Sequence, residues 1–148
     1  MHASDPPAGP DDPRCTCHLL RSAARRVTQV YDDALRPAGL KTSQFSLLAT
    51  LHHAEALTLG ELAERLSMDR TTLTRNLRPL QQAGWIERVS DPVDRRRIHL
   101  VVTAAGRATL AHARPLWRDA QHAFRARLGA PSVMALHTAL DDTLEHLR

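Results

Sequence analysis

The sequence predicts a mainly α-helical chain that carries one small β-hairpin. Over most of its 148 residues, apolar side chains recur every three or four positions, which is the period of an amphipathic helix. In residues 85–101 the period shortens to two, which is typical of paired strands. The composition, 43% hydrophobic and 24% charged, argues against a wholly disordered or collagen-like chain. We expect four helices, the hairpin and two further helices, in that order.

The first helix is expected to follow a short tail. Residues 1–12 are acidic and rich in proline, and this composition predicts disorder. Asp12 and Pro13 then match the N-cap and the first position of a helix. Apolar residues continue at helical spacing until Pro37 and Gly39, which are expected to end this helix.

Three more helices are expected before the hairpin, and each has a capping residue in front of it. Ser43 is the expected cap of the second helix. Thr58, with Glu61 three residues later, forms a capping box that opens a short third helix. Asp69 ends a tight turn and is expected to cap a fourth helix over about residues 70–83.

The hairpin and the long helix after it follow from turn and capping signals. Residues 85–89 and 97–101 alternate apolar and polar side chains, and the turn-rich segment 90–96 between them predicts a basic hairpin tip. Thr103 is the expected cap of the fifth helix, in which Pro115 is expected to cause a kink or an opened turn. A Gly-Ala-Pro break then separates the last helix.

Basic charge is concentrated where the fourth helix and the hairpin lie. The chain has a net charge of +4, and residues 70–97 contain seven arginines against three acidic side chains. The sequence isoelectric point is about 10.0, which is suited to an anionic partner. A solvated surface would explain the charge alone, but this density also suits contacts with nucleic-acid phosphates.

Two short helices joined by a tight turn and followed by a hairpin predict a winged helix-turn-helix, whose second helix enters the DNA major groove. The fourth helix has Leu73, Leu77 and Leu80 on one face and hydrogen-bond donors on the other. The candidate DNA contacts are Arg70, Thr71, Thr72, Thr74, Arg75, Arg78, Arg95, Arg96 and Arg97. Asp94 is expected to position a neighbouring arginine of the hairpin tip by a charge-assisted hydrogen bond.

Four strings of residues, at 62–77, 80–84, 91–96 and 100–106, follow a specific pattern that includes Asp-Pro-Val-Asp-Arg-Arg at the hairpin tip. Together they resemble the MarR family of bacterial transcriptional regulators, over about residues 14–147. The resemblance implies that Arg96 enters the minor groove and that the first and last two helices form a dimer interface. It also implies an effector pocket where that interface meets the winged domain.

A homodimer is expected from the residues as well. The first, fifth and sixth helices each carry an apolar stripe, and one small winged domain cannot cover all three, although packing within one chain is the alternative. We therefore expect a helical dimerisation region at 13–40 and 104–148, and a winged helix-turn-helix domain at 41–103. A two-fold dimer predicts a palindromic double-stranded DNA operator.

The signal that controls such a regulator is less clearly marked. Cys15 and Cys17 lie near the start of the first helix, where the helix dipole favours a reactive thiolate and neighbouring acidic residues oppose it. Redox sensing and inert thiols remain alternatives, and metal binding by Cys15 and His18 would need a ligand from a second chain. Tyr31, His52 and Trp117 are candidates to line a small-molecule effector pocket, although core packing is an alternative for Tyr31 and Trp117.

The leading hypothesis is a dimeric repressor that a small molecule or an oxidant releases from DNA. No cofactor, metal or catalytic residue is assigned, and we do not expect an enzyme. The alternatives are a winged-helix dimerisation or protein-interaction module and a thiol-based redox enzyme. No apolar run approaches the roughly 18 residues that span a bilayer, and no secretory signal is present, so we expect a cytoplasmic, nucleoid-associated protein without a membrane partner.

Overall fold

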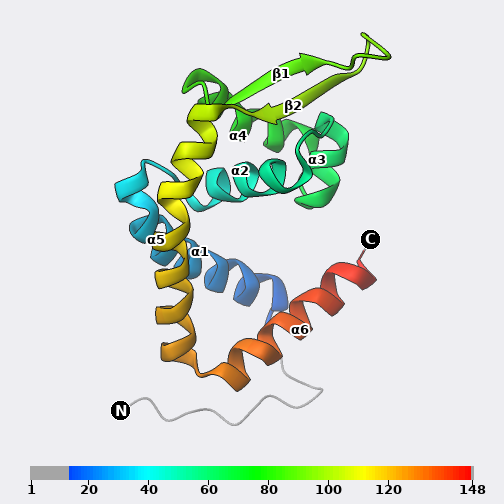
Figure 1. Cartoon of the computed structure of the whole chain (residues 1–148). Coiled ribbons are helices and arrows are strands. Elements are labelled where there is room, and N and C mark those ends of the chain that lie inside the picture. The colour runs from blue at the N-terminus through cyan, green and yellow to red at the C-terminus, as the bar shows by residue number, and fades with distance from the viewer. Residues whose placement is uncertain (1–13, 148) are drawn as a thin grey trace.

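The computed structural model describes residues 14–147 and has the predicted order of elements (Figure 1). The elements are α1 (Thr16–Leu35), the 3-10 turn η1 (Arg36–Ala38), α2 (Thr42–Ala54), α3 (Leu59–Arg65), α4 (Arg70–Gln82), β1 (Ile86–Ser90), β2 (Ile98–Val102), α5 (Ala104–Leu128) and α6 (Ala130–His146). The predicted fold class, mainly helical with one hairpin, is confirmed. The expected tail at 1–12 and the expected cap at Asp12 and Pro13 lie outside the described residues.

One end of the molecule is a compact winged unit. Leucines of α2, α3 and α4 pack together beneath the hairpin, and the predicted apolar stripe of α4 is buried, with Leu73, Leu77 and Leu80 at most 1% exposed. The strands pair antiparallel from Ile86 opposite Val102 to Ser90 opposite Ile98. A single bridge between Leu57 and Leu100 joins the segment before α3 to this sheet. The core thus fixes where the outer faces of α4 and the hairpin point.

The long helix α5 links the winged unit to the rest of the chain. In Figure 1 it runs from the hairpin past α2 and α1 to the start of α6. It is one continuous helix that contains Pro115, and the kink or opened turn expected there stays a prediction. Within residues 14–147, no helix is long and apolar enough to cross a membrane.

The start of α2 differs from the prediction because a distant side chain caps it. Ser43 lies inside the helix, and Lys41 is the N-cap residue. The carboxylate of Asp32 in α1 accepts hydrogen bonds from the backbone N–H and the hydroxyl of Thr42, both at 2.7 Å. The side chain of Gln44 accepts the N–H of Lys41 at 2.9 Å. These contacts satisfy the first donors of α2 without Ser43.

The junction between the hairpin and α5 has no room for a side chain. The N–H of Thr103 donates to the carbonyl of Trp85 at 3.0 Å, and the Thr103 hydroxyl donates to the carbonyl of Gly84 at 2.6 Å. This brings α5 so close that a Cβ on Gly106 would lie 2.2 Å from the Trp85 oxygen and 2.8 Å from a methyl group of Val102. Because the carbonyl of Trp85 bonds to Thr103 at this junction, β1 begins one residue later than predicted.

We predict that Gly106→Ala destabilises the protein by about 1–3 kcal/mol, the usual cost of forcing an extra carbon into a packed site. The overlap is with backbone, which cannot rotate away. Chemical denaturation of the wild type and the variant measures the difference in the free energy of unfolding.

Gly60→Ala is the matched control, because its added Cβ would lie 3.1 Å from the mobile end of the Arg70 side chain. That side chain can move, so little stability should be lost. Equal unfolding midpoints for Gly106→Ala and the wild type would contradict this account of the junction.

Candidate nucleic-acid interface

The first turn of α4 is held by its N-cap. One carboxylate oxygen of Asp69 accepts the backbone N–H of Thr72 at 2.8 Å, and the other accepts the Thr72 hydroxyl at 2.6 Å. Both bonds hold the pKa of Asp69 below its usual value, and the bond from the hydroxyl has the larger effect. The cap predicted from the sequence is confirmed, and Thr72 supplies both of its hydrogen bonds.

Three candidate contacts of α4 have free donors on its outer face. Thr71, Arg75 and Arg78 are exposed, and within residues 14–147 their side chains have no hydrogen-bond or ion-pair partner. Thr72 and Thr74 differ, because each hydroxyl proton is already donated within the helix; that of Thr74 goes to the Arg70 carbonyl at 2.8 Å. The structure thus divides the predicted contacts into free and occupied donors.

Arg70 and Asn76 lie at the edges of this face. The guanidinium of Arg70 folds back over the first turn of α3 beside Gly60. The amide of Asn76 is half-buried and points toward the sulfur of Met68 at 3.9 Å. Neither side chain extends freely into solvent from the centre of the face.

The hairpin tip is a closed turn, which we call the wing loop (residues 91–97). The backbone N–H of Asp91 donates to the carbonyl of Arg97, and the N–H of Arg97 donates to the carbonyl of Asp94, both at 2.9 Å. One oxygen of the Asp91 carboxylate accepts the N–H groups of Val93 and Asp94 at 2.7 and 3.0 Å. These two backbone bonds hold the pKa of Asp91 below its usual value, and the bond from Asp94 has the larger effect.

The wing arginines point in different directions. The Arg96 side chain is 95% exposed; its Nε lies 3.5 Å from Asp94, whose oxygen also accepts the Arg96 backbone N–H at 3.1 Å. Arg95 is exposed without a partner among residues 14–147. Arg97 turns back toward Glu61 of α3, at 3.9 Å. Arg95 and Arg96 are therefore the cations that the tip presents outward.

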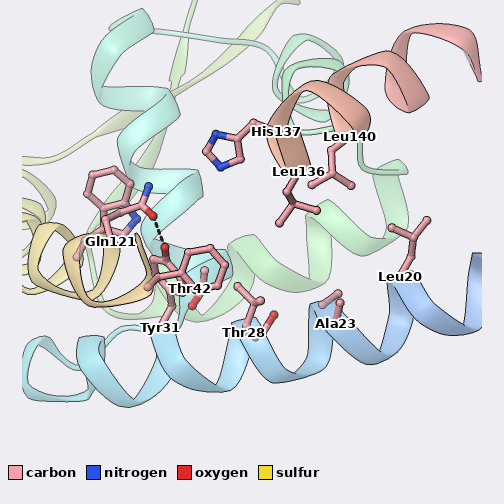
Figure 2. Close-up of a pocket in the computed structure, with 13 residues that line it drawn as sticks. Leu20, Ala23, Thr28, Tyr31, Thr42, Gln121, Leu136, His137 and Leu140 are labelled. Carbon is pink, nitrogen blue, oxygen red and sulfur yellow. Dashed lines mark hydrogen bonds between the residues drawn. The ribbon is translucent and has the colours of Figure 1, made fainter. Parts of the chain in front are cut away.

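Two of the three candidate pocket residues line one hollow. Tyr31 and Trp117 face a hollow of about 490 Å³ between α1, α5 and α6. The Tyr31 hydroxyl donates to the side-chain oxygen of Gln121, and the two groups lie together at one end of the hollow (Figure 2). Burial raises the pKa of Tyr31, and Arg125 partly opposes this shift. His52 is exposed and lines a separate hollow beside Val102 and Arg107, so the structure does not bring it together with Tyr31 and Trp117.

The two cysteines are free and exposed at the beginning of α1. Cys15 is the N-cap residue, and Cys17 lies in the first turn. In the part of the chain that the structure describes, no group of three or more His, Cys, Asp or Glu side chains is placed to hold a metal ion. A redox or metal-dependent role of these thiols stays a prediction.

The sequence interpretation missed several residues of both sites. Asp91 was noted only as part of a motif, although an aspartate before a proline is a common start of a turn closed by its own side chain. His99 gave no signal, because its partner lies across the hairpin. Gln121 and His137 line the hollow but lie on helices whose apolar pattern alone was interpreted.

Comparison with known proteins gives the same fold. The MarR family model matches residues 40–98. The multiple antibiotic resistance protein MarR of Salmonella typhimurium is 30% identical over 128 residues, which cover 85% of this chain and 88% of the relative. Two solved structures are also similar: the Mycobacterium tuberculosis transcriptional regulator MosR in complex with DNA and an Escherichia coli MarR mutant complexed with operator DNA.

The MosR structure is 40% identical with a TM-score of 0.77, and the match covers 91% of this chain and 99% of that one. The MarR structure is 28% identical with a TM-score of 0.78, and covers 86% and 92%. These matches span both the winged unit and the flanking helices. The chain therefore belongs to the MarR family of transcriptional regulators.

Proposed function

We propose that two copies of this chain form a sequence-specific regulator that reads a palindromic DNA duplex with α4 and the wing loop. Members of the family are transcriptional regulators, so the expectation that the chain is not an enzyme is confirmed. The observation that carries the proposal is the set of free donors on α4 and at the hairpin tip. We assign the role of a repressor, released by a small molecule or an oxidant and acting on the nucleoid in the cytoplasm.

The chemistry of the free donors suits the two grooves. Arg75 and Arg78 extend from the outer face of α4, and a guanidinium grips guanine O6 and N7 with two hydrogen bonds. Thr71 can donate to a base edge or a phosphate. At the wing, Arg95 and Arg96 suit the narrow, negative minor groove.

The occupied side chains have a supporting role in this proposal. Thr72 completes the cap of α4, and Thr74 bonds to its own helix. Arg97 ties the wing loop to Glu61, while Asp94 holds Arg96. Thr72, Thr74, Arg97 and Arg70 were predicted to contact DNA, and we propose instead that they orient the other contacts before any DNA binds, as Asp94 was predicted to do.

Arg75→Ala and Arg96→Ala are each predicted to weaken binding of a palindromic duplex by roughly tenfold or more, because a specific arginine contact is worth about 1–3 kcal/mol. The duplex is the one that the wild-type protein enriches from a randomised library. Where the lost contact is to phosphate, the slope of log K against log salt should fall by about one. Titration by fluorescence anisotropy at several salt concentrations measures both.

Arg127→Ala, in the last turn of α5 and far from the wing, is the control and should bind like the wild type. The mass of each variant in solution must match that of the wild type. Unchanged affinity for both Arg75→Ala and Arg96→Ala would reject this surface as the DNA-reading site.

The dimer is supported by apolar side chains that the chain does not cover by itself. Among the described residues of α6, only Val133 is buried. Met134, Leu144 and Leu147 are 70%, 55% and 81% exposed. Figure 1 shows α6 leaving the far end of α5 and extending away from it. We infer that a second copy of the chain covers these side chains, because exposed apolar patches mark interaction sites and most oligomers are symmetric assemblies of identical chains.

Leu144→Glu is predicted to shift the protein from dimer to monomer while it keeps its helical content, because the charge replaces apolar contact with the partner. Sedimentation velocity and circular dichroism measure the two properties. Ala105→Glu, exposed in the first turn of α5, is the matched control and should remain dimeric. A wild-type protein that sediments as a monomer would exclude the dimer.

The hollow beside Tyr31 is proposed as the effector site. Its lining is apolar, with a few polar groups at the end where Tyr31, Thr42 and Gln121 lie together (Figure 2). Its volume, about 490 Å³, is in the range of small-molecule sites. Because α1 and α5 also carry exposed apolar residues of the proposed dimer interface, a ligand here can change the spacing of the two DNA-reading surfaces.

We predict that the fluorescent apolar probe 8-anilinonaphthalene-1-sulfonate binds this hollow and that Ala24→Trp, which fills it, removes most of the fluorescence gain. Ala108→Trp, on the exposed side of α5, should leave the probe signal unchanged. Equal signals from the two variants would show that the probe binds elsewhere and would count against this site.

A further inference from the structure

A histidine and a carboxylate meet at the base of the wing. Nε2 of His99, on β2, lies 3.0 Å from one carboxylate oxygen of Asp91, the first residue of the wing loop. The side chains are only 18% and 21% exposed. Partial exclusion of water makes this pair stronger than the exposed ion pairs of the same surface.

The same carboxylate holds the backbone of the wing loop. While one oxygen of Asp91 faces His99, the other accepts the N–H groups of Val93 and Asp94 at 2.7 and 3.0 Å. His99 therefore fixes the rotation of the Asp91 carboxylate from the strand side. The Asp91 carboxylate in turn fixes the backbone of Asp94, the residue that contacts Arg96.

The last link is from Asp94 to Arg96. An oxygen of Asp94 accepts the Arg96 N–H at 3.1 Å and lies 3.5 Å from its Nε. The Arg96 side chain is otherwise 95% exposed. A continuous series of contacts thus runs from a partly buried histidine on β2 to the guanidinium at the wing tip.

The contact with Asp91 is the one hydrogen bond of the His99 ring among residues 14–147. Nε2 of the ring faces Asp91, while Nδ1 is buried and has no hydrogen-bond partner among those residues. From α3, Glu61 faces the ring, and Glu64 and Arg65 line the same hollow. Arg97 of the wing loop pairs with Glu61, so the side-chain partner of Asp91 is His99 and not Arg97.

We propose that His99 is a positioning residue for DNA binding: through Asp91 and Asp94 it holds Arg96 in the orientation that the minor groove requires. This inference rests on the proposed function, because it concerns how the wing reads DNA. It assigns roles to His99 and Asp91, neither of which is placed in contact with DNA.

A double-mutant cycle tests the proposal with the full chain and the duplex enriched by the wild-type protein. His99→Leu removes the donor to Asp91 and is expected to weaken binding about fivefold to tenfold, in the range of measured couplings between linked residues. In the Arg96→Ala background the same substitution should cause almost no further loss. A residue that only stabilised the fold would add its effect in both backgrounds.

Conservative replacements separate the hydrogen bond from the shape of the ring. His99→Gln places an amide N–H near the position of Nε2 and is expected to restore most of the affinity. His99→Asn is too short to reach Asp91 and is expected to bind like His99→Leu. Thermal unfolding of each variant shows whether it is folded at the temperature of the titration.

Amide hydrogen exchange provides a readout without DNA. In His99→Leu the N–H groups of Val93 and Asp94 should exchange faster than in the wild type, and in His99→Gln they should not. Additive losses in the cycle, or unchanged exchange in His99→Leu, would overturn the positioning role alone. Failure of the wild-type protein to enrich any duplex would overturn the proposed function, and this role with it.

Discussion

The backbone contact between Trp85 and the first turn of α5 is the constraint on which the rest of the molecule depends. The Trp85 carbonyl accepts the N–H of Thr103 and lies so close to Gly106 that a methyl group would overlap with it. Side-chain rotation cannot relieve a contact between backbone atoms. The winged unit is therefore tied to α5, and α5 to the helices that are proposed to form the dimer.

In the function proposed above, this constraint links effector binding to DNA binding in physical terms. The hollow beside Tyr31 lies between α1, α5 and α6, whereas α4 and the wing lie at the other end of α5. A ligand that changes the angle between these helices changes where α5 directs the winged unit. In a two-fold dimer, a small change of that angle alters the distance between two recognition helices, which must match a DNA turn of about 34 Å.

In the proposed DNA-reading surface, neighbouring polar residues divide between folding and recognition. Thr71 and Thr72 are neighbours of the same type, yet one has a free hydroxyl and the other completes the cap of α4. Arg96 and Arg97 differ in the same way, since Arg97 turns to Glu61 and Arg96 points outward. The side chains used for folding hold those that are proposed to contact DNA, and such preorganisation reduces the ordering needed on binding.

The sequence alone determined the helix caps at Thr58, Asp69 and Thr103 and the two faces of α4, because these signals act between residues three or four positions apart. Tertiary structure decided the start of α2, the direction of Arg97 and the partner of Asp91. Each depends on a side chain from another element: Asp32, Glu61 and His99, respectively. The periodicity of the sequence contains no information about such contacts between elements, because these contacts are set by how the core packs the elements against each other.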